Sequence, residues 1–226
     1  MVPRSAPTRA PAQSPAVELL LVDARARRFT QDRARRTYEA LIEAAEQAFI
    51  EDGYDATGSP DIAARAGVSV GTFYRYFDDK KQAFVEVSRR HLAAGYHRIL
   101  EQLTPERFVG KARHATIALA IDILLDHVAR YPRMHRVFVE MSLRDQDIGE
   151  LRRAFDEVSR AKLAQLIGAI ATRAVVPDPE ATAWVIHIAA VECASTIAGL
   201  HGPPTIDVDR AKAALGRVIE RALFDA

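Results

Sequence analysis

The sequence has a single cysteine and no long apolar run. The lone thiol, Cys193 in a chain of 226 residues, excludes an internal disulfide and any cysteine-rich metal site. No apolar stretch approaches the roughly 18 residues that a membrane-spanning helix needs. The early patch at residues 19–22 is too short for the roughly 7–15 apolar residues of a signal peptide. We therefore expect a soluble protein that stays in a reducing cytoplasm.

The patterns of common helical enzymes are also missing. There is no His-Glu-x-x-His zinc motif, no Glu-x-x-His pair of a di-iron site and no glycine-rich phosphate loop. Four polar residues share one expected helix, but their spacing is poor, since neighbours such as Asp126 and His127 point apart. These four residues, which we interpret as a solvated face, are His114, Asp122, Asp126 and His127. The protein is expected not to be an enzyme and to use no cofactor or metal.

The overall charge has no strong bias, because 31 basic residues oppose 30 acidic ones for a net charge of +1. Nucleic-acid binders usually carry their charge as a local patch, so this average excludes nothing. Residues 1–28 are predicted to be a disordered basic arm, poor in periodicity and rich in Pro, Ala and Ser. A basic stretch that begins near the end of this arm and runs to residue 36 is either a solvated charge run or a set of contacts to DNA phosphates. The arginines of this stretch are Arg25, Arg27, Arg28, Arg33, Arg35 and Arg36.

Apolar residues recur at helical spacing from Arg33 onward, and strand-like alternation is absent, so the chain is predicted to be all-α. Within this pattern, residues 59–77 read SPDIAARAGVSVGTFYRYF, as expected of two short helices that cross at a tight turn. Ser59 and Ser69 are favoured N-caps, and Gly67 lies where the backbone conformation is costly for other residues. Only a few residues separate the two helices, which predicts a helix-turn-helix.

The second helix of this motif has side chains suited to DNA, since such a helix enters the major groove with its N-terminal residues. Thr72 can hydrogen-bond a base or lay its methyl group on thymine, Val70 offers apolar contact, and Gly71 permits close backbone approach. Tyr74 and Tyr76 are either packing aromatics or phosphate ligands. Phe73 and Phe77 already supply the core side, so we expect both tyrosines to face outward.

The stretch from about Arg33 to Val87 resembles the N-terminal domain of the TetR family of bacterial repressors. The matching features are Ala44-Ala45, Phe49, Gly53-Tyr54, Ile62-Ala63, Ala66-Gly67-Val68-Ser69, Gly71 to Phe77, and Lys80. This resemblance covers about a quarter of the chain. It implies that Thr72, Tyr74, Tyr76 and Lys80 contact DNA, with Ser69, Val70 and Gly71 near the bases. The predicted DNA contacts are Ser59, Ser69, Val70, Gly71, Thr72, Tyr74, Arg75, Tyr76 and Lys80.

The start of the first motif helix departs from the family pattern. Family members touch phosphate there, but Pro60 lacks an N–H group and Asp61 adds a charge that repels phosphate. The Ser59 hydroxyl is the group left to make this contact.

The resemblance implies a domain division as well. Residues 29–80 are predicted to form a three-helix helix-turn-helix DNA-binding domain, and residues 81–226 a larger helical ligand-binding and dimerisation domain. The helix at 180–200 is apolar nearly all round, and an amphipathic helix at 208–224 follows. These last two helices either close the domain's own core or pair with a partner's copies. A homodimer would place two recognition helices about one DNA turn, ~34 Å, apart on a palindrome.

Family regulatory domains normally enclose an apolar ligand pocket. Its candidate lining residues, each otherwise a plain core residue, are Phe138, Met141, Trp184, His187 and Cys193. The sequence thus predicts a cytoplasmic, nucleoid-associated bacterial regulator of double-stranded DNA, a homodimeric repressor released from its operator by an unknown small apolar effector. The alternative is a DNA-binding regulator or DNA-organising protein with no small-molecule pocket.

Overall fold

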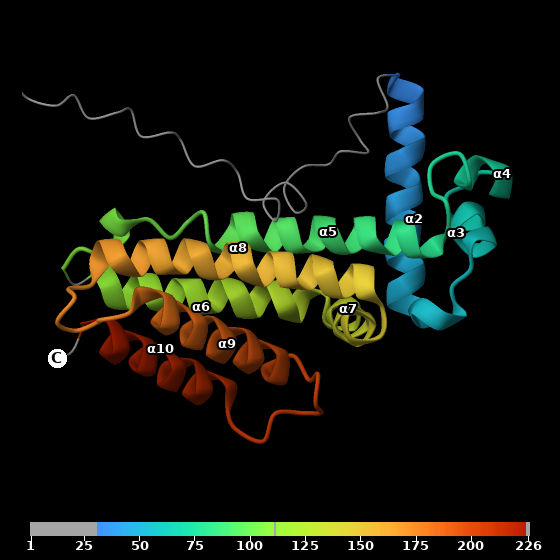
Figure 1. Cartoon of the computed structure of the whole chain (residues 1–226). Helices are drawn as coiled ribbons and strands as arrows, with labels where there is room; N and C mark the ends of the chain where they lie inside the picture. The colour runs from blue at the N-terminus through green and yellow to red at the C-terminus, as the bar shows by residue number, and fades with distance from the viewer. Residues whose placement is uncertain (1–30, 111, 225–226) are drawn as a thin grey trace, which may run out of the picture.

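The structure is a computed structural model, which describes residues 31–110 and 112–224; the predicted arm at 1–28 lies outside them. All regular elements of the described residues are helices, which confirms the all-α prediction (Figure 1). They are α2 (Asp32–Ala56), α3 (Ser59–Arg65), α4 (Val70–Phe73), α5 (Lys80–Ile99), the 3-10 helix η2 (Pro105–Phe108), α6 (Ala112–Arg130), α7 (Pro132–Arg144), α8 (Gln146–Ile170), α9 (Pro179–Ile197) and α10 (Val208–Phe224).

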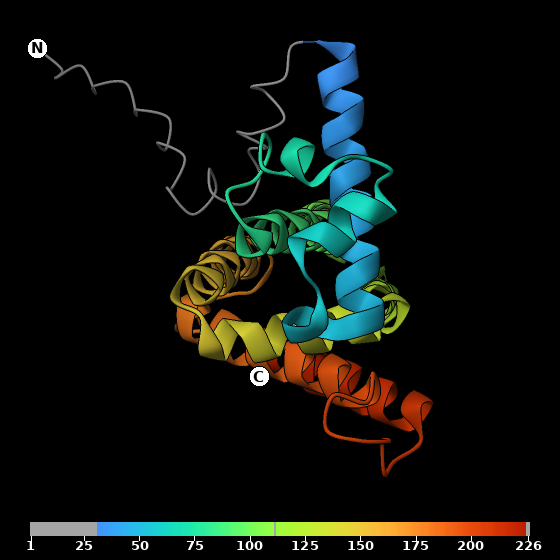
Figure 2. The same ribbon diagram turned by 90° about the vertical axis from the view of Figure 1, so that its right-hand side faces the viewer.

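Helix α2 is amphipathic and buries Tyr38, Leu41, Ala45 and Phe49, which recur at helical spacing. It crosses one end of the long helices, with α3 and α4 packed on its side (Figures 1 and 2). Gly53, with φ of 81°, breaks the regular backbone of α2, and one further turn carries the helix to Ala56. The small core here is aromatic: the rings of Phe49 and Phe84 meet edge to face, with their centroids 5.0 Å apart.

Helix α5 connects the two halves of the molecule. Its first turns pack on α2, and one hydrophobic cluster continues from α2, α3 and α4 through Phe84 and Val87 into α7 and α8. Ion pairs tie the same elements together at the surface. Arg144 at the end of α7 donates to Asp55 Oδ2 at 2.9 Å, and Lys81 lies 2.5 Å from Asp147 Oδ2 at the start of α8.

The rest of the molecule is a bundle in which α5, α6 and α8 run side by side, with α9 and α10 along one side and α7 across the end next to α2 (Figure 1). Its separate hydrophobic cluster joins α6, α8, α9 and α10. Helices α5, α8 and α9 each begin at an aspartate N-cap, namely Asp79, Asp145 and Asp178. No described helix is long and apolar enough to cross a membrane.

Candidate nucleic-acid interface and cavity

The turn between α3 and α4 is held by local hydrogen bonds. The Ser69 Oγ accepts from the Thr72 amide at 3.1 Å and lies 2.9 Å from Thr72 Oγ1, so Ser69 is the predicted N-cap of α4. Gly67 has φ of 67°, which favours glycine. Ala63 is fully buried, and its carbonyl accepts from Val68 N at 3.0 Å, so the chain turns directly over it. This is the geometry of a helix-turn-helix.

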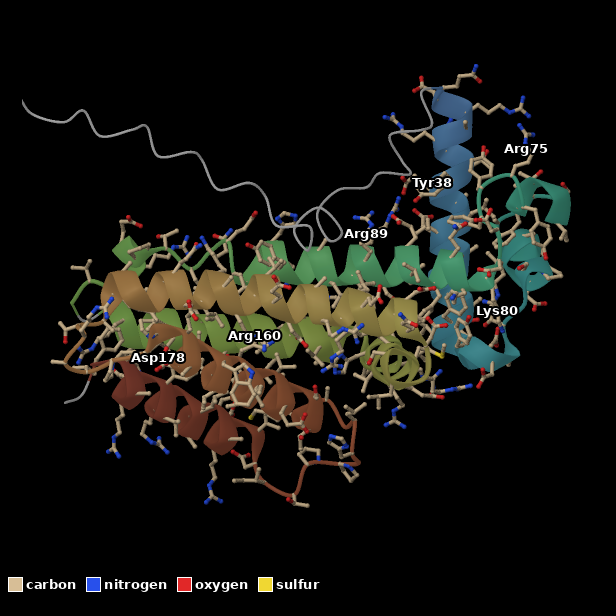
Figure 3. All side chains as sticks on the ribbon, viewed as in Figure 1. Tyr38, Arg75, Lys80, Arg89, Arg160 and Asp178 are labelled. Atoms are coloured by element: carbon tan, nitrogen blue, oxygen red, sulfur yellow. The ribbon has the colours of Figure 1, made fainter. Side chains whose placement is uncertain are left out.

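The outer face of α4 is open. Ser69, Val70, Gly71, Tyr74 and Arg75 are exposed, Tyr74 by 54%. Arg75 points away from the body of the protein (Figure 3), and its side chain makes no hydrogen bond or ion pair within residues 31–110 and 112–224.

The same side of the molecule carries further positive charge. Both views place α4 beside the N-terminal half of α2, away from α9 and α10 (Figures 1 and 2). Arg33, Arg35 and Arg36, at the start of α2, are exposed there. Arg75 and these three arginines together give this face the local positive charge that binding to a phosphate backbone requires.

Helix α4 ends at Phe73, before the two tyrosines, although turns continue to Phe77, whose amide donates to Phe73 O at 3.0 Å. This early end changes where the two tyrosines lie. Tyr74 faces solvent as predicted, but Tyr76 is half-buried, its ring centroid 6.4 Å from that of Tyr38. The prediction that both face outward is therefore wrong for Tyr76, because the chain beyond α4 turns back over α2.

The start of α3 also differs from the expectation. The N-cap is Gly58 rather than Ser59, and its amide donates to Asp61 Oδ2 at 2.8 Å. Ser59 is the first residue of the helix and only 8% exposed. The Gly58 amide is thus taken by Asp61, Pro60 has no N–H group and the Ser59 hydroxyl is not exposed, so this helix start is a poor phosphate site.

Lys80 has an unexpected position. Its Nζ donates to the backbone carbonyls of Tyr54, Asp55 and Thr57, at 2.9, 3.3 and 2.8 Å, and lies over the Tyr54 ring. A lysine has three N–H donors, and the end of α2 takes all three. In this conformation Lys80 caps the C-terminus of α2, so its donors are not free for the phosphate contact that the resemblance implies.

A cavity of about 180 Å³ lies inside the bundle, walled by residues of α5 to α10. Most of its wall is aliphatic or aromatic. The polar groups are concentrated where α5, α6, α8 and α9 pass close to α7. They are His91, His127, His135, Arg152, Asp156, Ser159 and His187.

The histidines at this end are held by neighbours. The rings of His91 and His127 stack with centroids 4.6 Å apart. Gly95 allows this, because a Cβ there would lie 2.8 Å from His127 Nε2. Burial, reinforced by His127 and His135, lowers the pKa of His91 to about 3. Burial and the charge of Arg152 lower the pKa of His135 to about 4. Both rings are therefore neutral at pH 7.

Comparison with known proteins supports this reading of the site. Residues 41–87 match the family model of bacterial regulatory proteins of the tetR family. The transcriptional repressor BepR of Brucella suis is 30% identical over 62% of this chain and 68% of its own length. The chain belongs to the tetR family.

Other members resemble the chain over different shares of its length. The transcriptional activator FasR of Mycolicibacterium smegmatis is 29% identical over 44% of each chain, less than half the length of that relative. A transcriptional regulator from Rhodococcus sp. Rha1 has the same fold, with a TM-score of 0.66, 21% identity and coverage of 84% of this chain and 98% of its own. Within this family the helix-turn-helix is the DNA-binding part of a transcriptional regulator.

The candidate pocket residues divide into two groups. Phe138 and His187 line the cavity. Met141 is buried in the cluster shared with the DNA-binding half, Cys193 packs beside the cavity without lining it, and Trp184 is 50% exposed. The pocket prediction is therefore wrong for Met141, Trp184 and Cys193, because helical spacing alone cannot distinguish inward faces that meet a void from those that meet other side chains.

Sequence reasoning also missed much of the polar end. His127 is buried and not on a solvated face as interpreted, while His91, His135 and Ser159 were not singled out. The available signal is weak: each is a lone polar residue among apolar neighbours. Only the packing of α5 to α9 brings them together.

Proposed function

We propose that this protein is a homodimeric transcriptional repressor, acting at the nucleoid in the cytoplasm, that leaves a palindromic operator when a small, largely apolar molecule enters the cavity. The observation that supports it most is the presence of both parts in one chain. An open recognition helix lies at one end and a cavity at the other, with α7 in contact with both α2 and the cavity. Its relatives are named as regulators and not as enzymes.

The DNA contacts follow from exposure. Ser69, Val70, Gly71 and Thr72 are at the N-terminal end of α4, the part of a recognition helix that meets base edges. Tyr74 and Arg75 follow on the open face and are assigned to phosphate oxygens. Ser59, Tyr76 and Lys80 are left out of the proposed contact set because the first is buried, the second half-buried and the third engaged by α2.

Dimerisation is assigned to the outer face of α9 and α10. Four of the large apolar side chains that the described residues expose lie on these two helices: Trp184, Val185, Ile188 and Val218. Burying them against the same face of a second copy fits a two-fold interface. The two α4 helices of such a dimer would read half-sites about one turn, ~34 Å, apart.

Release from DNA requires that the cavity and α4 be mechanically linked. Helix α7 contributes His135 and Phe138 to the cavity and Arg144 to the ion pair with Asp55 at the end of α2. A ligand that fits one position of α7 better than another shifts the orientation of α2, and with it the spacing of the recognition helices. The shift is limited by the difference in affinity for the two states.

The test is capture of sheared genomic DNA by the full-length protein at near-physiological salt with non-specific competitor, followed by sequencing. Enrichment of one short palindrome is expected. Arg75→Ala should weaken binding to all sequences and reduce the slope of log affinity against log salt by about 1, whereas Arg173→Ala, an exposed arginine after α8, should not. Uniform binding without a palindrome would favour a DNA-organising protein instead.

A further inference from the structure

Ser159, on the cavity wall, is a buried hydroxyl group without a hydrogen-bond partner. Its side chain is 1% exposed, and within the described residues its Oγ bonds to nothing. A buried hydroxyl left unbonded is costly, so most are bonded in native proteins. An unbonded one that faces a cavity marks a position that a bound molecule can occupy.

His135 offers a second polar atom. Its Nε2 lies 2.9 Å from Ser195 Oγ, while that hydroxyl donates its only hydrogen to Val191 O at 2.8 Å. The Ser195 oxygen must therefore accept, and His135 Nε2 carries the hydrogen. In the neutral ring the other nitrogen, Nδ1, is then a hydrogen-bond acceptor.

His187 is held by a different neighbour. Its Nε2 lies 3.1 Å from Asp156 Oδ1, and a carboxylate only accepts, so Nε2 again carries the hydrogen. Asp156 and Ser159 are three residues apart on α8, which places them on one face of the helix, and His187 and Ser159 both line the cavity.

The charges at this end compensate one another. Arg152 lies 3.8 Å from the Asp156 carboxylate, and burial keeps His91 and His135 neutral. Arg152, the permanent cation of this wall, already has a carboxylate beside it, so a buried anion would have to compete with Asp156 for it and would be costly to desolvate. The opposite end of the cavity is apolar, with Leu103, Phe108, Leu166, Ile170 and Leu223.

We propose that the cavity binds an uncharged amphiphile, an alcohol or a phenol, with its hydroxyl beside Ser159 at the polar end and its apolar body toward the α6 N-terminus and the end of α10. The ligand hydroxyl accepts from Ser159 Oγ and donates its single hydrogen to one acceptor, the Nδ1 of His135. This assignment rests on the proposed function, since it names the class of effector for the same cavity.

The test uses isothermal titration calorimetry on the full-length protein without DNA, with three probes of equal chain length: 1-octanol, 1-methoxyoctane and octanoate. The ether keeps the apolar body but lacks the donor, so it should bind about five- to tenfold more weakly than the alcohol. Octanoate carries a charge that finds no free partner, so it should bind at least about tenfold more weakly than the alcohol.

Two serine variants isolate the hydroxyl. Ser159→Ala should remove most of the preference for octanol over the ether. Ser88→Ala is the matched control: Ser88 is an equally buried and unbonded serine on α5, outside the cavity wall, and its loss should leave the preference unchanged. Tighter binding of octanoate, equal binding of alcohol and ether, failure of all three probes to bind, or an unchanged preference in Ser159→Ala would overturn the proposal.

The repressor function is measured separately, by operator binding in the same protein. A protein that prefers octanol but enriches no palindrome refutes the repressor and keeps the ligand class. One that is released from a palindrome by octanoate rather than by octanol refutes the ligand class alone.

Discussion

The DNA-binding end and the cavity end of this molecule are built in opposite ways. Around α2 to α4 the core is solid and aromatic, with Tyr38, Phe49, Phe73 and Phe77 at most 1% exposed. The bundle of α5 to α10 instead encloses a void of about 180 Å³ and buries histidines and an unbonded serine at its wall. Protein interiors are normally packed without voids of this size, so the bundle gives up stability that the DNA-binding end keeps.

Polar groups show the same contrast. At the end of α2, Thr57 Oγ1 donates to the backbone carbonyl of Gly53 at 2.7 Å. Lys80 Nζ donates to three further backbone carbonyls. In the cavity, Ser159 Oγ and His135 Nδ1 have hydrogen-bonding capacity to spare. A DNA-binding surface must keep one geometry, whereas an effector site must leave space and free hydrogen-bonding groups for a ligand. The difference indicates which half is rigid and which half is responsive.

The largest expected effect on this contrast is a difference in stability loss between alanine variants of two phenylalanines, one at each end. Phe73→Ala removes a fully buried ring from the solid core and should lower the free energy of unfolding by about 3–5 kcal/mol. Phe155→Ala removes a half-buried ring that already borders the void, and should cost only about 1–2 kcal/mol. Urea denaturation of both variants measures the difference. Equal losses would mean that the bundle is as tightly packed as the DNA-binding end.

The buried histidines make the cavity end sensitive to acid. The pKa of His91 is about 3 when folded and near 6.5 when unfolded, so below pH 6.5 the unfolded chain takes up a proton that the folded one does not. Stability is lost as the pH falls through this window, by about 2–3 kcal/mol at pH 4.5 from His91 alone. His91→Phe should lose that much less than the wild type between pH 7 and 4.5. His97→Gln, at an exposed histidine of the same helix, should leave the loss unchanged.

Lys80 tests the rigidity of the other end. Lys80→Met keeps the aliphatic stem but removes three charge-assisted hydrogen bonds to α2, so it should lower the free energy of unfolding by about 2 kcal/mol. Lys162→Met, at a lysine without an ion pair among the described residues, should cost much less. A Lys80 variant of full stability that instead binds DNA with a lower salt slope would restore the phosphate contact expected from the sequence.

The predictions from the sequence agree with the structure in the tightly packed DNA-binding end. Ser69, Gly67 and the apolar faces of α2 to α4 identify the motif because caps, turns and helical spacing are local properties. Lys80 shows the limit: its partners lie more than 20 residues earlier, and no local pattern reports a lysine that caps another helix. Trp184 shows a second limit of sequence-based prediction, because an apolar helix has the same composition whether it faces the core of its own domain or a partner.

The cavity was the least predictable part because a void has no sequence signature. Its polar end takes groups from α5, α6, α7, α8 and α9, each an ordinary isolated histidine, serine or charged residue in the chain. Only two of the five candidate pocket residues, Phe138 and His187, line it. Their juxtaposition depends on helix packing, which composition and periodicity do not specify.

The smallest expected effect is the change in stability when an alanine is enlarged to leucine. It is the most diagnostic one, because it should have opposite signs at the two ends of the molecule. Ala45→Leu forces three extra carbons into a fully buried site on α2 and should destabilise the protein by about 1–3 kcal/mol. Ala190→Leu puts the same atoms into the cavity from α9, and should stabilise the ligand-free protein by about 0.5–1 kcal/mol while blocking the effector. Thermal denaturation with and without 1-octanol measures both properties. If Ala190→Leu were destabilised like Ala45→Leu, the bundle would hold no usable space, and a regulator without a small-molecule site would become the better account of this protein.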